Sequence, residues 1–155
     1  MHEAFRVYVD LLHPSLERLI GMSPLKTDRL PRDLPEEYIY LFGEDENHLY
    51  VGRTRKLRQR LRQHSIPSAP QNQASFAFRL ACEVRGRTEA SYKTKDSRDD
   101  LCDDPNFAEI FTQAKARVRK MDVRFVAEND PLRQALLEMY VSIVLKTRYN
   151  DFETH

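Results

Sequence analysis

Tyr40, Tyr50, Arg60 and His64 lie within one short stretch of the chain. A guanidinium can contact two phosphate oxygens at once and stays charged in proteins. A phenol, whose pKa is ordinarily near 10, can orient a water molecule, and it becomes a base where nearby positive charge lowers that pKa. Side chains of these types, gathered in one small volume, would suit chemistry on a phosphodiester.

A β-hairpin is predicted to carry the two tyrosines. Residues 38–42 (YIYLF) and 48–51 (HLYV) read as short strands, because apolar and aromatic residues fill both. Residues 43–47 join them, and Gly, Asp and Asn tolerate the dihedral angles of tight turns. Gly52 is expected to end the second strand, where the backbone must turn sharply or approach another group closely.

An unusually basic helix is predicted to follow, with Thr54 as its N-cap. Leu57 and Leu61 would dock it on the sheet, since residues four apart share a helix face. No acidic residue occurs between Glu46 and Glu83, so the helix forgoes the opposite-charge pairs that usually support exposed helices. An anionic partner would compensate. The candidate phosphate contacts are Arg53, Arg55, Lys56, Arg58 and Arg62.

The rest of the chain predicts mostly helices. Residues 1–20 have helical apolar spacing that Pro14 interrupts, and the proline-rich residues 21–35 read as a linker or arm. Helices are expected over 74–82, 105–118 and 131–146, a third strand over 121–126, and a loop over 85–100. The predicted class is therefore α+β: a small three-stranded, mainly antiparallel sheet flanked by helices.

Composition places the protein among folded single domains. Hydrophobic residues make up 41% and charged residues 32% of 155 residues, and no apolar run is long enough to cross a membrane. The N-terminus lacks the features of a secretory signal, so we expect a cytoplasmic protein. The net charge is only +1, so any affinity for nucleic acid must come from local segregation of charge.

An ordered set of residues resembles the GIY-YIG nuclease domain. The tripeptides 38–40 (YIY) and 50–52 (YVG) stand where the family has its two named tripeptides, and the resemblance extends from about residue 35 to residue 150. Two positions depart from the pattern, since Tyr38 replaces the first glycine and Arg53 stands where relatives often have lysine or serine. The matching set is Tyr40, Tyr50, Gly52, Arg60, His64, Glu138 and Asn150.

This resemblance implies a fold, a domain organisation and an activity. Residues 1–34 would be an N-terminal helical extension and linker, and residues 35–155 a nuclease domain with an insertion at about 85–120, before the third strand. The implied activity is endonucleolytic hydrolysis of DNA, with Mg²⁺ or Mn²⁺ as cofactor. The implied catalytic residues are Tyr40, Tyr50, Arg60, His64 and Glu138, supported by Gly52 and Asn150.

Glu138 is the candidate metal ligand, because Mg²⁺ takes oxygen ligands and keeps several waters, so one carboxylate with a substrate phosphate can hold it. Arg60 would stabilise charge in the transition state, and either tyrosine could be the base. The same residues admit a noncatalytic reading, in which the basic helix over 53–64 only binds nucleic acid. A single site cuts one strand, so cleavage of both strands would require a homodimer or two successive encounters.

Overall fold

The computed structural model describes residues 1–34, 37–86 and 98–152. The chain forms two compact units, one made of residues 1–60 and 121–155 and the other of residues 61–120. The segment between the second and third strands therefore interrupts the first unit. The predicted insertion at about 85–120 lies in the second unit, and its assignment as an insertion stays a prediction.

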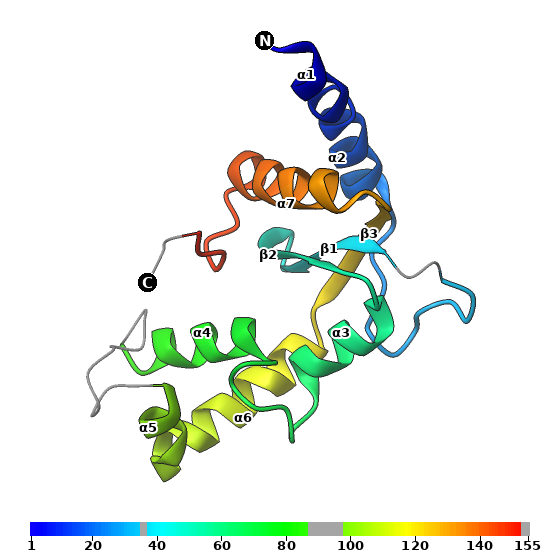
Figure 1. The fold of residues 1–155 in the computed structure, drawn as a ribbon. Coiled ribbons are helices and arrows are strands. Elements are labelled where there is room, and N and C mark those ends of the chain that lie inside the picture. The colour runs from blue at the N-terminus through cyan, green and yellow to red at the C-terminus, as the bar shows by residue number, and fades with distance from the viewer. Residues whose placement is uncertain (35–36, 87–97, 153–155) are drawn as a thin grey trace. The chain divides into compact units, whose positions relative to one another are not determined.

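The first unit contains a three-stranded antiparallel sheet, which confirms the predicted α+β class (Figure 1). Its strands are β1 (Tyr38–Glu44), β2 (Asn47–Thr54) and β3 (Asp122–Ala127), in the order β2-β1-β3. The hairpin loop is shorter than predicted. Asp45 and Glu46 alone form the turn, and both have positive φ (50° and 65°), as the twist of a two-residue hairpin requires.

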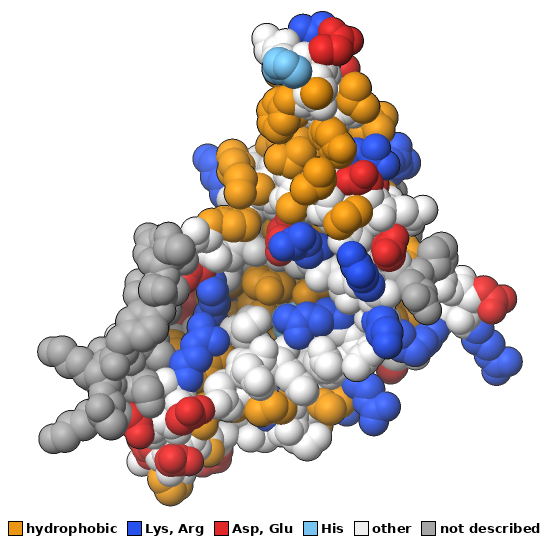
Figure 2. Space-filling model, in the orientation of Figure 1, with side chains coloured by type: hydrophobic (Ala, Val, Ile, Leu, Met, Phe, Trp, Pro, Cys, Tyr) orange, Lys and Arg blue, Asp and Glu red, His pale blue; other side chains and the backbone are white. Residues whose placement is uncertain are grey.

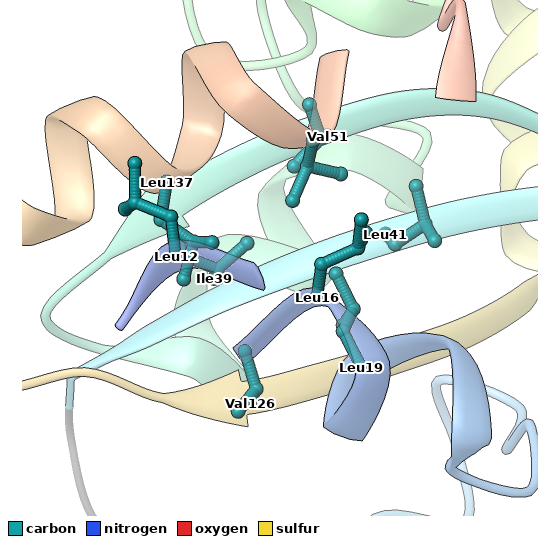
Figure 3. Close-up of a cluster of buried hydrophobic side chains, with 9 residues drawn as sticks. Leu12, Leu16, Leu19, Ile39, Leu41, Val51, Val126 and Leu137 are labelled. Carbon is teal, nitrogen blue, oxygen red and sulfur yellow. The ribbon is translucent and has the colours of Figure 1, made fainter. Parts of the chain in front are cut away.

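One face of the sheet holds the hydrophobic core of this unit (Figure 3). Helices α2 (Leu12–Gly21) and α7 (Pro131–Leu145) pack on it, and α1 (Glu3–Val9) contacts both helices. Because side chains alternate along a strand, Ile39 and Leu41 of β1 enter this core together, and Val51 of β2 joins them. The core residues are Leu12, Leu16, Leu19, Ile39, Leu41, Val51, Val126, Leu137 and Val141.

Helix α7 is apolar on two faces. Leu137 and Val141 point into the core, whereas Leu132, Met139 and Ile143 stay exposed. Figure 2 shows hydrophobic side chains gathered over the helices α1, α2 and α7. Asp130 caps the start of α7 through two backbone N–H groups, each 2.9 Å from its Oδ1. The inner face and the N-cap together fix the rotation of α7, and with it the direction of Glu138.

The N-terminal region differs from prediction in two details. Pro14 does not interrupt a helix but lies in the first turn of α2, where its missing N–H leaves no intrahelical bond unmade. The expected linker also contributes to the sheet. Leu25 exchanges backbone hydrogen bonds of 2.9 and 2.8 Å with Val123, so it covers the outer edge of β3.

Helix α3 (Leu57–Ser65) carries the basic sequence and spans the boundary between the units. Leu57 and Leu61 are buried, as their spacing predicts. Thr54 Oγ1 accepts a hydrogen bond of 3.0 Å from Lys56 N, so it stabilises the turn just before the helix and does not cap the helix itself.

The second unit is helical, with α4 (Ser75–Val84), α5 (Arg98–Asp103) and α6 (Pro105–Arg119). Phe78, Phe107 and Phe111 pack ring against ring in its centre. Helices α4 and α6 agree with prediction. The predicted loop over 85–100 is wrong for 98–100, which begin α5, and its residues 87–97 lie outside the described part of the chain. The first turn of α5 carries Asp99 and Asp100, which favour a helix N-terminus.

Candidate active site

The phenol of Tyr40 lies directly over Gly52. The two residues are partners across the β1–β2 ladder, and Tyr40 is almost fully buried. A Cβ atom at position 52 would lie 2.3 Å from the Tyr40 hydroxyl oxygen, which is closer than atoms can approach. The prediction that Gly52 ends the strand is therefore wrong. Gly52 sits inside β2, which continues to Thr54, and it leaves room for the ring.

Arg60 joins the two tyrosines. Its Nε donates to the Tyr40 hydroxyl oxygen over 3.3 Å, and the guanidinium also hydrogen-bonds the side chain of Tyr50. The rings of Tyr40 and Tyr50 are tilted, with centroids 6.4 Å apart. Tyr50 is less buried than Tyr40, so its side chain is the more accessible of the two phenols. The structure thus brings three of the predicted site residues together within the first unit.

The electrostatics of this cluster keep Tyr40 neutral and Arg60 charged. Burial, reinforced by Tyr50 and Glu138, raises the pKa of Tyr40 well above its ordinary value, and Arg60 offsets this only in part. Burial alone would lower the pKa of Arg60, but its electrostatic interactions and hydrogen bonds with Tyr40 and Tyr50 outweigh this and raise that pKa. The cluster therefore presents a permanent positive charge beside a protonated phenol.

Glu138 reaches this cluster from α7. Its side chain is 20% exposed, and its Oε2 lies 3.1 Å from the Nε of Arg53 on β2. Burial raises the pKa of Glu138, while the positive charges of Arg53 and Arg60 lower it in part. Glu138 in turn acts on the pKa of Tyr40. A carboxylate far along the chain thus shares one electrostatic environment with the hairpin and the basic helix.

Asn150 forms two hydrogen bonds with the backbone of β2, on the edge of that strand that does not pair with β1. Its Oδ1 accepts from Val51 N over 2.9 Å and its Nδ2 donates to Val51 O over 2.7 Å, as a neighbouring strand would. The hydroxyl of Thr147 is a further partner, 2.8 Å from the same Oδ1. Val51 separates Tyr50 from Gly52, so these bonds hold the strand at its two site residues. Sequence reasoning missed Thr147, for which no pattern in the chain gives a signal.

His64 is placed differently. It belongs to the second unit, where its imidazole is fully buried. The geometry above is confined to residues of the first unit, so a part for His64 in the site stays a prediction.

The predicted phosphate contacts have varied surroundings. Arg53 is paired with Glu138, Arg58 donates to the carbonyl of Pro31, and Arg55 lies 3.9 Å from Glu37 with its side chain 71% exposed. Lys56 and Arg62 are exposed. The sequence did not indicate the ion pair between Arg53 and Glu138, because Arg53 was predicted to contact phosphate and Glu138 to bind the metal.

The donor set can be tested against a divalent cation. Within residues 1–34, 37–86 and 98–152, no three His, Cys, Asp or Glu side chains converge as a ready-made metal cage. One partly buried carboxylate fits a hard cation that keeps most of its waters, such as Mg²⁺, better than a cation that needs several protein ligands. Glu138 is the residue that would hold it.

A comparison with protein families supports this reading. Residues 36–100 match the model of the GIY-YIG catalytic domain, which supports membership of the GIY-YIG nuclease domain family. The match includes the hairpin, Arg60 and His64, whereas Glu138 and Asn150 lie beyond it.

The family consists of nucleases that typically depend on a divalent metal, and a nuclease domain implies a nucleic-acid substrate. Searches of curated proteins and of solved structures gave no significant match. Among the described residues, the helices are too short or too polar to span a membrane.

Proposed function

We propose that this protein is a divalent-metal-dependent endonuclease that hydrolyses DNA phosphodiester bonds. The supporting observation is that Glu138 on α7 pairs with Arg53 of β2 and interacts electrostatically with Tyr40 and Arg60, which are hydrogen-bonded to each other. These side chains come from different elements, and polar and ionisable groups that are partly or fully buried near one another are typical of functional sites.

Each residue has a distinct role in the proposed reaction. Arg60 stabilises the negative charge that develops on the phosphate as a water oxygen bonds to phosphorus and the bond from phosphorus to O3′ breaks. Glu138 holds the cation, which when bound neutralises charge on the leaving oxygen. Tyr50, acting as the phenolate, orients the water and takes its proton to become a neutral phenol. We assign this role to Tyr50 because it is the more accessible of the two, and the buried Tyr40 positions Arg60.

A plasmid-nicking assay tests the proposal. Supercoiled DNA is incubated with the protein and Mg²⁺, with EDTA as the metal-free control. We expect nicked or linear product with the native chain and a loss of at least roughly 100-fold with Glu138→Gln, which keeps the shape of the side chain but removes its charge. Equal rates for both proteins would exclude Glu138 as the metal ligand.

A noncatalytic nucleic-acid-binding module is the second candidate. The observation that favours it is the ion pair between Arg53 and Glu138, which occupies the only carboxylate assigned to the metal. This candidate predicts DNA binding that weakens with added salt and no metal-dependent product at any protein concentration. Turnover therefore separates the two candidates, and binding alone does not.

Other parts of the proposal have no observation behind them yet. A cytoplasmic location, DNA rather than RNA as the substrate, the phosphate contacts of the basic residues and a homodimer that cuts both strands all stay predictions. Sedimentation of the protein with and without a DNA duplex would test the homodimer.

A further inference from the structure

The ion pair between Arg53 and Glu138 has a consequence for metal binding. The Nε of Arg53 lies 3.1 Å from Glu138 Oε2, one of the two carboxylate oxygens that a divalent cation would approach. Two cations cannot share that oxygen at close range without strong repulsion. We infer that Arg53 competes with the divalent metal for Glu138, so that the metal binds only as Arg53 moves away. This inference rests on the proposed function, because it takes Glu138 as the metal ligand.

The position of Arg53 allows such a movement. Along β2, Val51 enters the core, so Arg53, two residues later, leaves the strand on the same face, toward α7. Its side chain is 48% exposed, whereas that of Glu138 is 20% exposed. Glu138 is therefore the fixed partner and Arg53 the one with open space beside it. A long arginine side chain whose guanidinium group is exposed to solvent can change rotamer without disturbing the core.

Arg53 also serves the site before the metal arrives. Its guanidinium lies beside Glu138 Oε2 and balances the negative charge of a carboxylate that is only 20% exposed. Arg53 is thus a positioning residue that holds Glu138 in place until the metal binds. Once displaced, it is free to contact a phosphate of the substrate.

Direct measurement of Mn²⁺ affinity tests the competition without reference to turnover. Free Mn²⁺ is quantified by electron paramagnetic resonance at pH 8, where high pH favours the ionised carboxylate in every variant. We expect Arg53→Gln to bind Mn²⁺ roughly fivefold more tightly than the native chain, as the loss of a half-exposed ion pair would allow.

Arg133→Gln is the matched control. Arg133 lies on the same helix as Glu138 and forms an Arg–Glu pair of equal length, 3.1 Å, with Glu128. This variant removes one positive charge and one ion pair but leaves Glu138 untouched, so its Mn²⁺ affinity should change less than twofold. A similar gain in both variants would mean that net charge alone controls the affinity, and the competition would be refuted.

Glu138→Gln separates failure of this inference from failure of the proposed function. Loss of the Mn²⁺ site in Glu138→Gln, together with unchanged or weaker binding in Arg53→Gln, would overturn the competition and leave the metal site standing. Binding that persists in Glu138→Gln, or no binding to the native chain at millimolar Mn²⁺, would overturn the metal site and the competition together.

Discussion

Gly52 and Tyr40 fit together so closely that the space over the glycine is filled by the phenol ring. The Cβ of any larger residue would lie 2.3 Å from the tyrosine oxygen and 2.4 Å from the ring carbon that bears it. The ring cannot retreat easily, because Phe42 packs edge-on against it at a centroid distance of 5.8 Å. The orientation of the Tyr40 hydroxyl, and of Arg60 bonded to it, therefore depends on the absence of a side chain at position 52.

Gly52→Ala should consequently disturb both the site and the fold. We expect a loss of about 1–3 kcal/mol in the free energy of unfolding, typical of overpacking, and at least roughly a tenfold loss of nicking activity. Urea denaturation and the nicking assay measure the two effects. Gly21→Ala is the control, since a Cβ there meets no atom within 4 Å, and its free energy of unfolding should change by less than about 0.5 kcal/mol. Native activity in Gly52→Ala would show that the site tolerates a displaced Tyr40.

Asn150→Asp tests the bonds to the free edge of β2. The substitution keeps the shape of the side chain but replaces the Nδ2 donor by an oxygen. Two acceptors, this oxygen and Val51 O, would then face each other at the present distance of 2.7 Å. We expect a loss of about 1–3 kcal/mol in the free energy of unfolding, because the carbonyl loses its partner and faces a negative charge. Amide hydrogen exchange at Val51 should become faster by more than the loss of global stability accounts for. Unchanged exchange at Val51 would contradict this role of Asn150.

The two tyrosines should respond differently to removal of the hydroxyl group. Tyr50→Phe removes the proposed proton acceptor, so we expect a fall in kcat of roughly 100-fold or more with little change in DNA affinity. Tyr40→Phe removes the hydrogen bond to Arg60 and should lower kcat less, by roughly tenfold. Single-turnover cleavage measures both effects. The reverse ranking would assign the base to Tyr40.

The pH dependence of stability should reveal the burial of Glu138. Its pKa is raised in the folded chain, so the folded state favours the protonated acid, and ionisation lowers stability as pH rises through that pKa. Glu138→Gln cannot ionise. Its free energy of unfolding, relative to the native chain, should therefore be higher at pH 8 than at pH 4, as urea denaturation at each pH would show. A difference that stays constant, or that reverses, would contradict the raised pKa.

Lys115 should be essential for the second unit. Its ammonium group is buried, donates to the carbonyls of Pro67 and Ala69, the latter over 2.9 Å, and lies 4.3 Å from the centre of the Phe111 ring. Lys115→Met keeps the aliphatic length but leaves both carbonyls without this donor, so we expect a loss of about 1–3 kcal/mol in the free energy of unfolding. Arg119→Met, at an exposed position on the same helix, should change it by less than about 0.5 kcal/mol.

The elements of the fold were predicted best where apolar periodicity is strong. Helices α4, α6 and α7 and the three strands follow from spacing alone, since burial of one face imposes that spacing. Weakly patterned segments were not predicted correctly. Helix α5 was expected to be loop, and Leu25 was placed in a linker although it pairs with β3. Leu25 depends on Val123, a partner distant in the chain that local sequence does not reveal, and α5 is too short to show a clear apolar period.

The sequence by itself determined the types of side chain available to the site and the strands and helices that carry them. Only the tertiary structure decided which of them meet: Glu138 comes to Arg53 because the inner face of α7 must bury Leu137 and Val141, and Arg60 comes to Tyr40 because Gly52 leaves room for the ring. His64, which the spacing grouped with Arg60, is buried, and its part in the site stays a prediction. Periodicity reports the face of an element that is buried, whereas contacts between elements depend on packing across the whole chain.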